Sequence, residues 1–219
     1  MFSLFRKQKA TIYSIGITDL GWPIIKNDTG IIQWMNPAQT IAVSVNFFDL
    51  PPDIPAVKDI HLLRNFYRNN ISGVNGGVIE VDLSQQDQLT IIKTLFKIPQ
   101  ARGGTTYLAS LTLPFKTCSY VLKVQSAETG PTGMRETLIV DKLLSNNQST
   151  SLEERLSEWS ADPYDPHFKK GILMNQSEDE IYDALFPNHP LTQARKIITQ
   201  IKNDIKLKPE IGKLLPFYS

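Results

Sequence analysis

The stretch from Gly103 to Asp141 constrains the fold of this chain more than any other part. Two runs rich in apolar and β-branched residues, 105–114 and 118–126, flank a short turn, and this arrangement predicts an antiparallel hairpin. A corner rich in glycine and proline follows and leads into residues 132–145, for which helix is the better prediction. The β-branched residues of that segment leave an extended conformation open. We expect the hairpin to form the centre of a sheet.

Periodic patterns elsewhere supply partners for this hairpin. Strand candidates with alternating apolar residues lie at 10–17, 23–35, 39–48 and 77–83, and the second of them folds as a hairpin around an Asn-Asp-Thr-Gly turn. Helical spacing of apolar residues predicts helices at 56–70 and 85–97, and Pro99 ends the second. These elements predict an α+β fold, in which a mostly antiparallel sheet is flanked by helices in an αβα-like arrangement.

A polar, low-complexity segment at 145–151 is the one convincing linker in the sequence. It predicts an α+β sheet domain at 1–147 and a helical C-terminal extension at 148–219 that packs on this domain. Helices of the extension are expected at 152–159, at 178–186 and from Pro190 onward, where proline suits the first helical position.

Composition excludes several classes of function. The chain of 219 residues carries a formal net charge of +1, which gives no basic surface of the kind that binds nucleic acid. No stretch approaches the roughly 20 apolar residues that a membrane span requires, and the N-terminus lacks the order of charges and apolar residues typical of a secretory signal. The single cysteine, Cys118, allows no internal disulfide. We therefore predict a cytoplasmic protein.

Motifs for metal binding and catalysis are missing from the sequence. The three histidines, His61, His167 and His189, are far apart and match no zinc or calcium spacing. Asp162 and Asp165 are interpreted as turn formers that bond their own backbone. There is no Gly-x-Ser-x-Gly motif and no Cys–His signature around the cysteine. The sequence thus predicts no cofactor, no metal and no catalytic residue.

Two groups of residues remain as candidate sites. Glu128, Arg135 and Glu136 form a polar cluster that is either a brace for the corner or, alternatively, an acid/base pair beside an arginine. The C-terminal extension is rich in aromatic residues and proline, which suits both docking onto its own domain and binding of a partner. Candidate partner-binding residues in the extension are Trp159, Tyr164, Asp165, His167, His189 and Arg195.

The extension also carries a recognisable pattern. It reads Asp-Pro-Tyr-Asp-Pro at 162–166, Tyr-Asp at 182–183, Phe-Pro-Asn-His-Pro-Leu at 186–191, and then Arg195. This pattern resembles a family of uncharacterised bacterial proteins, and the resemblance implies a cytoplasmic immunity or accessory protein of secreted antibacterial toxins, such as those of type VI secretion, without enzyme activity. The order of elements in the main domain is similar to the Mog1/PsbP-like αβα folds, although a fold alone does not give a function.

The predicted function is therefore non-enzymatic protein binding. The expected partner is a cognate toxin or a secretion-system component, neutralised or escorted by direct contact and occlusion of its surface. The alternative is a small enzyme or ligand-binding protein with a pocket between the sheet and the extension. In that case Glu128, Arg135, Asp165 and His189 are the polar groups expected to converge.

Overall fold

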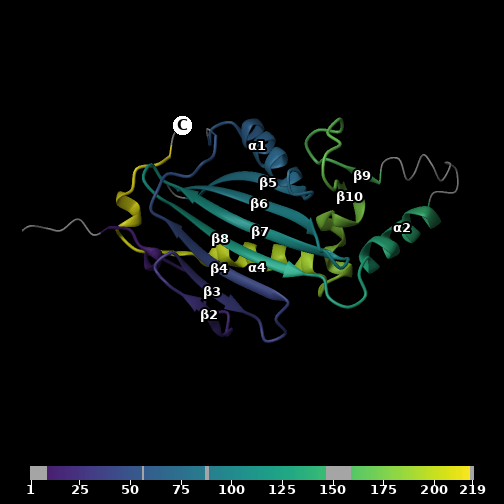
Figure 1. Ribbon diagram of the computed structural model, residues 1–219, viewed down its shortest axis with the longest axis horizontal. Coiled ribbons are helices and arrows are strands. Elements are labelled where there is room, and N and C mark those ends of the chain that lie inside the picture. The colour runs from purple at the N-terminus through teal and green to yellow at the C-terminus, as the bar shows by residue number, and fades with distance from the viewer. Residues whose placement is uncertain (1–8, 56, 87–88, 147–158, 218–219) are drawn as a thin grey trace, which may run out of the picture.

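A seven-stranded antiparallel sheet forms the centre of the computed structural model, which describes residues 9–55, 57–86, 89–146 and 159–217. The strand order across the sheet is β2-β3-β4-β8-β7-β6-β5 (Figure 1). The strands are β2 (Ile24–Asn27), β3 (Ile31–Met35), β4 (Ile41–Phe48), β5 (Gly77–Gln86), β6 (Leu89–Pro99), β7 (Thr105–Pro114) and β8 (Ser119–Ala127). The predicted α+β fold, with an antiparallel sheet flanked by helices, is confirmed.

The hairpin of β7 and β8 lies in the middle of the sheet. Its register pairs Leu111 with Leu122, and the amide of Phe115 closes the turn on the carbonyl of Cys118 at 2.9 Å. Both strands alternate between the two faces, so that Tyr107, Leu111 and Leu122 all point to the same side and are fully buried. The local pattern of apolar residues was therefore sufficient to predict this part of the fold.

Residues 89–99 form strand β6, so the helix predicted at 85–97 is wrong. Ile91 and Leu95 face one layer of the core while Ile92 and Phe96 face the other, and all four are buried. A strand that is buried on both faces loses the alternation of apolar and polar residues that identifies a half-exposed strand. Its apolar residues then also fit a helical spacing by coincidence.

The strand predicted at 10–17 does not join the main sheet. Residues Ile12–Ser14 form a 3-10 turn, η1, and the strand β1 is confined to Ile15–Gly16. Thr11 and Ser14 cap this turn through reciprocal side-chain bonds to backbone amides, which favours a turn over a strand. β1 pairs instead with β11 (Lys206–Leu207) near the end of the chain.

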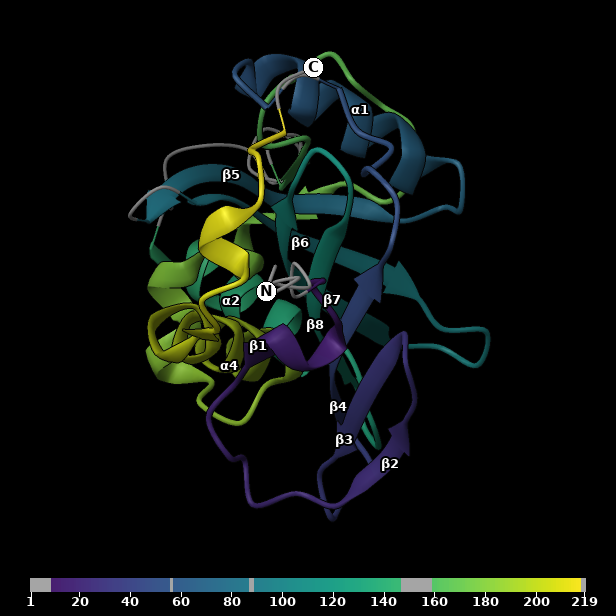
Figure 2. The ribbon, with the colours of Figure 1, turned by 90° about the vertical axis from the view of Figure 1, so that its left-hand side faces the viewer.

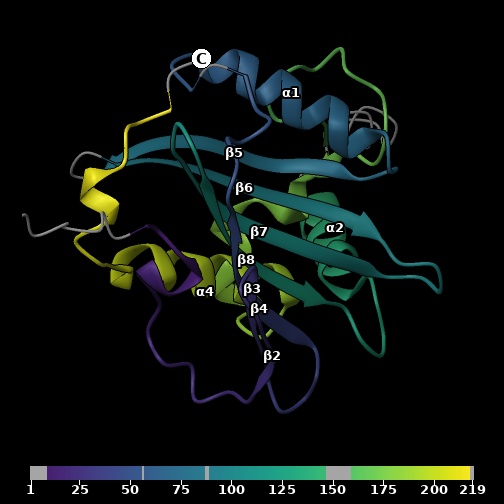
Figure 3. The same ribbon diagram turned by 60° about the vertical axis from the view of Figure 1, so that its left-hand side comes forward.

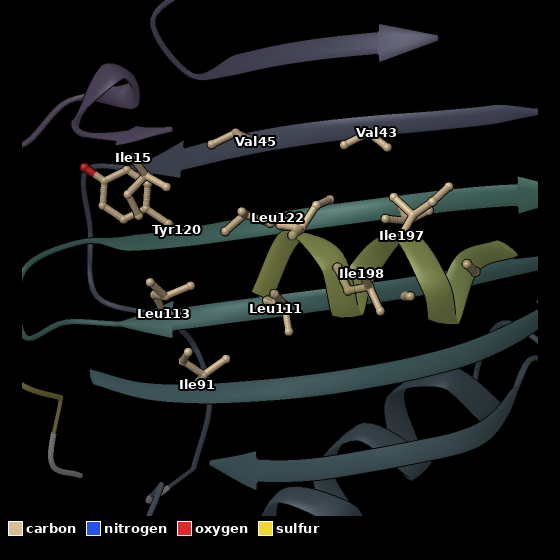
Figure 4. Close-up of a cluster of buried hydrophobic side chains, with 14 of the residues drawn as sticks. Ile15, Val43, Val45, Ile91, Leu111, Leu113, Tyr120, Leu122, Ile197 and Ile198 are labelled. Carbon is tan, nitrogen blue, oxygen red and sulfur yellow. The ribbon is translucent and has the colours of Figure 1, made fainter. Parts of the chain in front are cut away.

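Helices cover the two faces of the sheet unequally. Helix α4 (Pro190–Asp204) packs across β7 and β8 on one face, and α1 (Ile60–Ser72) lies over β5 on the other (Figures 2 and 3). The larger core lies beneath α4, where Ile197 and Ile198 meet Val43, Leu111 and Leu122 (Figure 4). Full burial of one such side chain contributes about 1.5–3 kcal/mol, so this core supplies most of the hydrophobic stabilisation.

The C-terminal extension contributes more than a covering layer. Its helix α4 begins at Pro190 as predicted, and Leu191, Ala194 and Ile201 are buried in the same core as the sheet strands. Residues 178–186, predicted as a helix, instead contain the 3-10 turn η3 (Glu180–Leu185), preceded by η2 (Gln176–Glu178). Two short strands, β9 (Ser160–Ala161) and β10 (Met174–Asn175), pair with each other.

Helix α2 (Met134–Asn146) confirms the helix predicted after the corner. It follows the end of β8 and stands at the margin of the sheet (Figure 1). The helix predicted at 152–159 and most of the linker at 145–151 lie outside the described residues. The division into units at 1–147 and 148–219 stays a prediction.

Candidate functional site

A pocket of about 330 Å³ opens where the start of β4 and the end of β8 meet the start of α2 and the loop before α4. We call it the corner pocket. Its polar lining includes Glu128, Arg135 and His189, and its apolar lining includes Met134 and Phe186. Residues from three distant stretches of the sequence thus meet at one site, and the volume is at the lower end of the range typical of ligand pockets.

Glu128 is the carboxylate of the corner pocket. Its Oε2 accepts a hydrogen bond from the amide of Thr105 at 2.7 Å, and its side chain is 8% exposed. Burial by itself raises the pKa of Glu128, but the neighbouring His189 and the amides of Thr105 and Gly133 outweigh this, so that the pKa lies below its ordinary value. The carboxylate is therefore charged at neutral pH.

His189 faces this carboxylate and also caps helix α4. Its Nδ1 accepts a hydrogen bond from the amide of Leu191 at 3.2 Å, and its Nε2 lies 3.4 Å from Oε1 of Glu128. Acceptance at Nδ1 assigns the neutral tautomer that carries its proton on Nε2. Nε2 is buried against the Glu128 carboxylate and has no aligned hydrogen-bond partner among the described residues.

Arg135 is fully buried at the base of α2 and holds the extension in place. Its Nε donates to the carbonyl of Ser177 at 2.6 Å, and Nη2 donates to the carbonyl of Asp179 and to Oδ1 of Asp183 at 3.0 and 2.9 Å. Nη1 donates to the hydroxyl of Thr192 at 3.0 Å. Every nitrogen of the guanidinium is therefore occupied by the protein itself, which identifies Arg135 as a structural brace.

A second arginine completes this brace. Arg195 Nη1 donates to Oδ1 of Asp183 at 3.0 Å, and its Nη2 donates to the carbonyl of Glu178 at 2.6 Å. The carboxylate of Glu178 pairs with Lys97 of β6 at 2.6 Å, and both side chains are buried. Removing one partner of such a pair is expected to cost about 3–5 kcal/mol, because the other charge would be left unpaired in the interior.

Tyr107 and Glu136 lie near this network, and the hydroxyl of Tyr107 donates to Oε1 of Glu178 at 3.5 Å. Burial raises the pKa of Tyr107, and the charges of Glu178, Glu136 and Glu128 raise it further. Oε2 of Glu136 is buried without a hydrogen-bond partner among the described residues. The cluster of Glu128, Arg135 and Glu136 predicted from the sequence is thus divided: Glu128 lines the pocket, Arg135 braces the extension, and Glu136 is only partly satisfied.

Four large apolar side chains beside the corner pocket are more than half exposed. They are Met134 (59%) and Leu138 (51%) on α2, and Ile181 (72%) and Leu185 (57%) on η3. The two elements run beside each other, because Arg135 of α2 bonds the carbonyl of Asp179 and Lys142 Nζ lies 5.8 Å from the ring centroid of Tyr182. We call these four side chains the α2–η3 surface.

Residues 162–168 pack against helix α1 in what we call the α1 contact. Arg68 pairs with Asp162 and Asp165 at 3.2 and 3.3 Å, and its guanidinium carbon lies 4.7 Å from the ring centroid of Phe168. The hydroxyl of Tyr164 contacts both the amide and the carbonyl of Val81, at 2.7 and 3.2 Å. This part of the extension is therefore docked onto its own domain.

The predicted turn chemistry of this segment is confirmed. Oδ1 of Asp162 accepts the amides of Tyr164 and Asp165, and Oδ1 of Asp165 accepts the amide of His167, each at 3.0 Å. The side chain of His167 is exposed, and Trp159 is half-buried just before β9. These side chains lie away from the pocket lining, so Glu128, Arg135 and His189 converge as the alternative prediction expected, whereas Asp165 does not.

Sequence reasoning missed Lys97, Glu178, Asp183 and Thr192. Lys97 was placed in a helix that the structure shows to be strand β6, so its direction into the interior was not visible. Glu178 and Asp183 belong to an acidic run that is typical of a solvated surface. A lysine within a run of apolar residues was the one available signal of a buried charge.

A second cavity of about 540 Å³ lies at the other end of β8, near the β7–β8 turn. Its lining includes Cys118, Phe47 and Leu214. Burial raises the pKa of the Cys118 thiol, so the cysteine is not activated as a nucleophile there. Within the described ranges, no group of three or more His, Cys, Asp or Glu side chains could hold a metal ion.

Comparison with known proteins gives a faint likeness of fold. No family model matches the chain, and no curated protein matches it. Among solved structures it is similar to the Ran-binding protein Mog1p of Saccharomyces cerevisiae, at 9% identity and a TM-score of 0.46, over 89% of this chain and 90% of that one. It is also similar to the PsbP protein CyanoP of Synechocystis, at 9% identity and a TM-score of 0.39, over 66% and 86%.

A third similar structure is a protein of Bacteroides thetaiotaomicron, with 9% identity and a TM-score of 0.36. The match spans 56% of this chain but only 41% of that protein's length. The neighbours thus include both folds that the order of elements suggested, while the resemblance to toxin immunity proteins stays a prediction. No helix in the described part of the chain combines the length and apolar character needed to cross a membrane.

Proposed function

We propose that this chain is a non-enzymatic protein-binding protein that holds its partner at the α2–η3 surface. The observation that carries the proposal is the exposure of Met134, Leu138, Ile181 and Leu185 on two neighbouring elements. Single exposed apolar residues are common on soluble proteins, whereas adjacent groups of them mark sites of interaction. On helix α2 the spacing of four residues puts Met134 and Leu138 on one side of the helix.

The arrangement of polar groups supports binding over catalysis. Acid/base chemistry needs a nitrogen or oxygen that is free to exchange a proton with a substrate. His189 uses Nδ1 as the cap of α4, and its Nε2 faces Glu128. Arg135 and Arg195 donate to carbonyl and carboxylate groups of the extension, which makes them structural.

The partner we propose is a cognate toxin or an accessory component of its secretion system. This choice rests on the resemblance of the segments at 162–166 and 186–191 to immunity-type proteins. Inhibition would follow from occlusion of the partner's surface, and a stable complex would bury about 1,200–2,000 Å² in total. The corner pocket and the α2–η3 surface adjoin, so one partner could cover both.

The experiment is direct binding to the products of the neighbouring genes, measured by calorimetry with purified proteins. We expect one product to bind with 1:1 stoichiometry. Leu138→Asp on α2 should weaken that binding at least about tenfold, since it puts a charge into an apolar contact. Leu62→Asp on α1 is the matched control, because Leu62 is also about half exposed (48%) but lies on a helix that is not part of the α2–η3 surface. Equal affinity of both variants would refute this surface.

A second candidate function is binding of a small ligand in the corner pocket. The observation in its favour is the pocket volume of about 330 Å³ with a buried carboxylate and an unpaired imidazole nitrogen. Mass spectrometry of the protein under native and denaturing conditions would detect a retained molecule. Met134→Trp, which places a larger side chain at the lining, should abolish such retention.

A further inference from the structure

We infer that the corner pocket receives a positively charged side chain, lysine or arginine, from the bound partner. This inference rests on the proposed binding surface and adds the chemistry of its anchor. The pocket lies directly beside Met134, which belongs both to its lining and to the α2–η3 surface. A segment lying on that surface can therefore insert one side chain into the pocket.

The charge of the pocket selects a cation. Glu128 is ionised at neutral pH, because the amide of Thr105 and the neighbouring His189 stabilise its charged form. The one other charged group in the lining, Arg135, is turned away and bonded to Asp183. His189 accepts the amide of Leu191 at Nδ1, which fixes the ring as the cap of α4. An entering cation would meet the ionised carboxylate of Glu128, whose Oε1 has only Nε2 of His189 beside it, at 3.4 Å.

The surroundings of the pocket have the same sign. Seven carboxylates lie within residues 128–146 and 176–189, and only four basic side chains lie in or bond to these segments. The carboxylates are Glu128, Glu136, Asp141, Glu178, Asp179, Glu180 and Asp183, and the basic residues are Lys97, Arg135, Lys142 and Arg195. The chain as a whole is close to neutral, so this face is locally acidic and favours encounter with a basic partner.

The walls of the pocket suit the rest of such a side chain. Ile41, Met134, Phe186 and Pro187 provide apolar surface in the same lining as the carboxylate. Lysine and arginine have long aliphatic stems that pack on apolar surface while the charged end reaches a polar group. A glutamate or aspartate would be repelled by Glu128, and a leucine would offer the carboxylate no hydrogen-bond donor.

The test uses amino-acid probes of defined charge and the full chain labelled with nitrogen-15. N-acetyl-lysine methylamide and N-acetyl-arginine methylamide are titrated and followed by NMR, with the norleucine and glutamate analogues as comparisons. We expect both cationic probes to shift the amides of Thr129, Asn188 and Gln193, which belong to the pocket lining. The norleucine analogue should bind at least about tenfold more weakly than the cationic probes, because it lacks the charge-assisted bond.

Glu128→Gln separates the role of charge from that of shape. We expect it to weaken the lysine probe at least about tenfold and to leave the norleucine probe unchanged. Glu180→Gln is the matched control, because Glu180 is an exposed carboxylate on η3 outside the pocket lining. Cationic probes that bind no better than norleucine, or that shift residues elsewhere, would overturn the inference even if Glu128→Gln fails to fold.

The outcomes distinguish this inference from the proposed function. If a partner binds through Leu138 but Glu128→Gln leaves its affinity unchanged, the surface is correct and the cationic anchor is wrong. If lysine and arginine probes bind in the pocket while no neighbouring gene product binds the chain, the anchor site stands and the proposed partner is wrong.

Discussion

The α1 contact and the corner pocket are both formed where the C-terminal extension returns to the sheet, yet they differ in the space that they leave. At the α1 contact, Asp162 and Phe168 press onto Arg68, and the hollow between them has no room for a water molecule. At the corner, an open volume of about 330 Å³ remains beside Glu128 and His189. Each region leaves a buried nitrogen unpaired, Nε of Arg68 and Nε2 of His189.

This comparison separates attachment from recognition. On the α1 side, the backbone of the extension packs closely against the backbone of β5. A Cβ added to Gly77 would lie 1.8 Å from the carbonyl oxygen of Ile172, so this side is an attachment of the extension to the sheet. Beside the corner pocket, exposed side chains such as Met134 and Leu138 remain uncovered. The extension is thus packed tightly onto its own domain at the α1 contact, whereas beside the corner pocket it leaves apolar side chains exposed to a partner.

The largest expected effect follows from removing the brace of the corner. Arg135→Met would leave Asp183 without one of its partners and the carbonyls of Ser177 and Asp179 without donors. We expect a loss of about 3–5 kcal/mol in the free energy of unfolding, measured by urea denaturation. Arg64→Met on α1 is the control, because Arg64 makes one hydrogen bond, to Val81, and stacks on Tyr164. Equal losses would show that the two regions are braced alike.

The next effect tests how tightly the α1 side is closed. Gly77→Ala forces the backbone at Ile172 to move, and overpacking of this kind costs about 3 kcal/mol or more when the neighbour is main chain. Hydrogen exchange of residues 160–175 should then become faster, while exchange in α2 should stay the same. Gly212→Ala is the control, since its added Cβ meets nothing within 4 Å. If hydrogen exchange at 160–175 stays slow in Gly77→Ala, the close packing of the two backbones does not hold this segment in place.

The central hairpin and helix α4 could be predicted from local sequence because their determinants are local. Alternating residues fix β7 and β8, and Pro190 with an apolar stripe fixes the start and buried face of α4. Strand β6 could not be predicted in the same way, because burial of both faces removed its period. The turn bonds of Asp162 were also predictable, as they span two or three residues.

The partners across the extension were beyond prediction because they depend on the completed fold. Lys97 meets Glu178 across 81 residues, and Arg135 meets Asp183 across 48. The sequence predicted that Arg135 and Glu136 lie beside Glu128. It did not show that all three guanidinium nitrogens of Arg135 would donate hydrogen bonds to the C-terminal extension. The corner pocket itself appears only once His189 is brought beside Glu128 by the packing of α4.

A smaller effect concerns the charge of Glu128 at the corner. Since folding lowers the pKa of Glu128, its carboxylate adds stability above the unfolded pKa of about 4.5. That contribution disappears as the pH falls below 4.5 and through the folded pKa. Wild type should exceed Glu128→Gln in stability by about 1–2 kcal/mol at pH 7, and the difference should shrink toward pH 3. Denaturant titrations at several pH values measure this, with Glu180→Gln as the control; a constant difference would contradict it.

The smallest effect removes one hydroxyl from the α1 contact. Tyr164→Phe loses the contacts of that hydroxyl with the amide and carbonyl of Val81, but it keeps the ring that lies 4.0 Å from the guanidinium carbon of Arg64. We expect a loss of about 0.5–1.5 kcal/mol by urea denaturation. Tyr13→Phe is the matched control, since the hydroxyl of Tyr13 bonds Asn27 on the exposed surface and its removal should change stability by less. Because the α1 contact is a joint, Tyr164→Phe should leave partner affinity unchanged, whereas a loss of affinity would move the binding face to this side of the molecule.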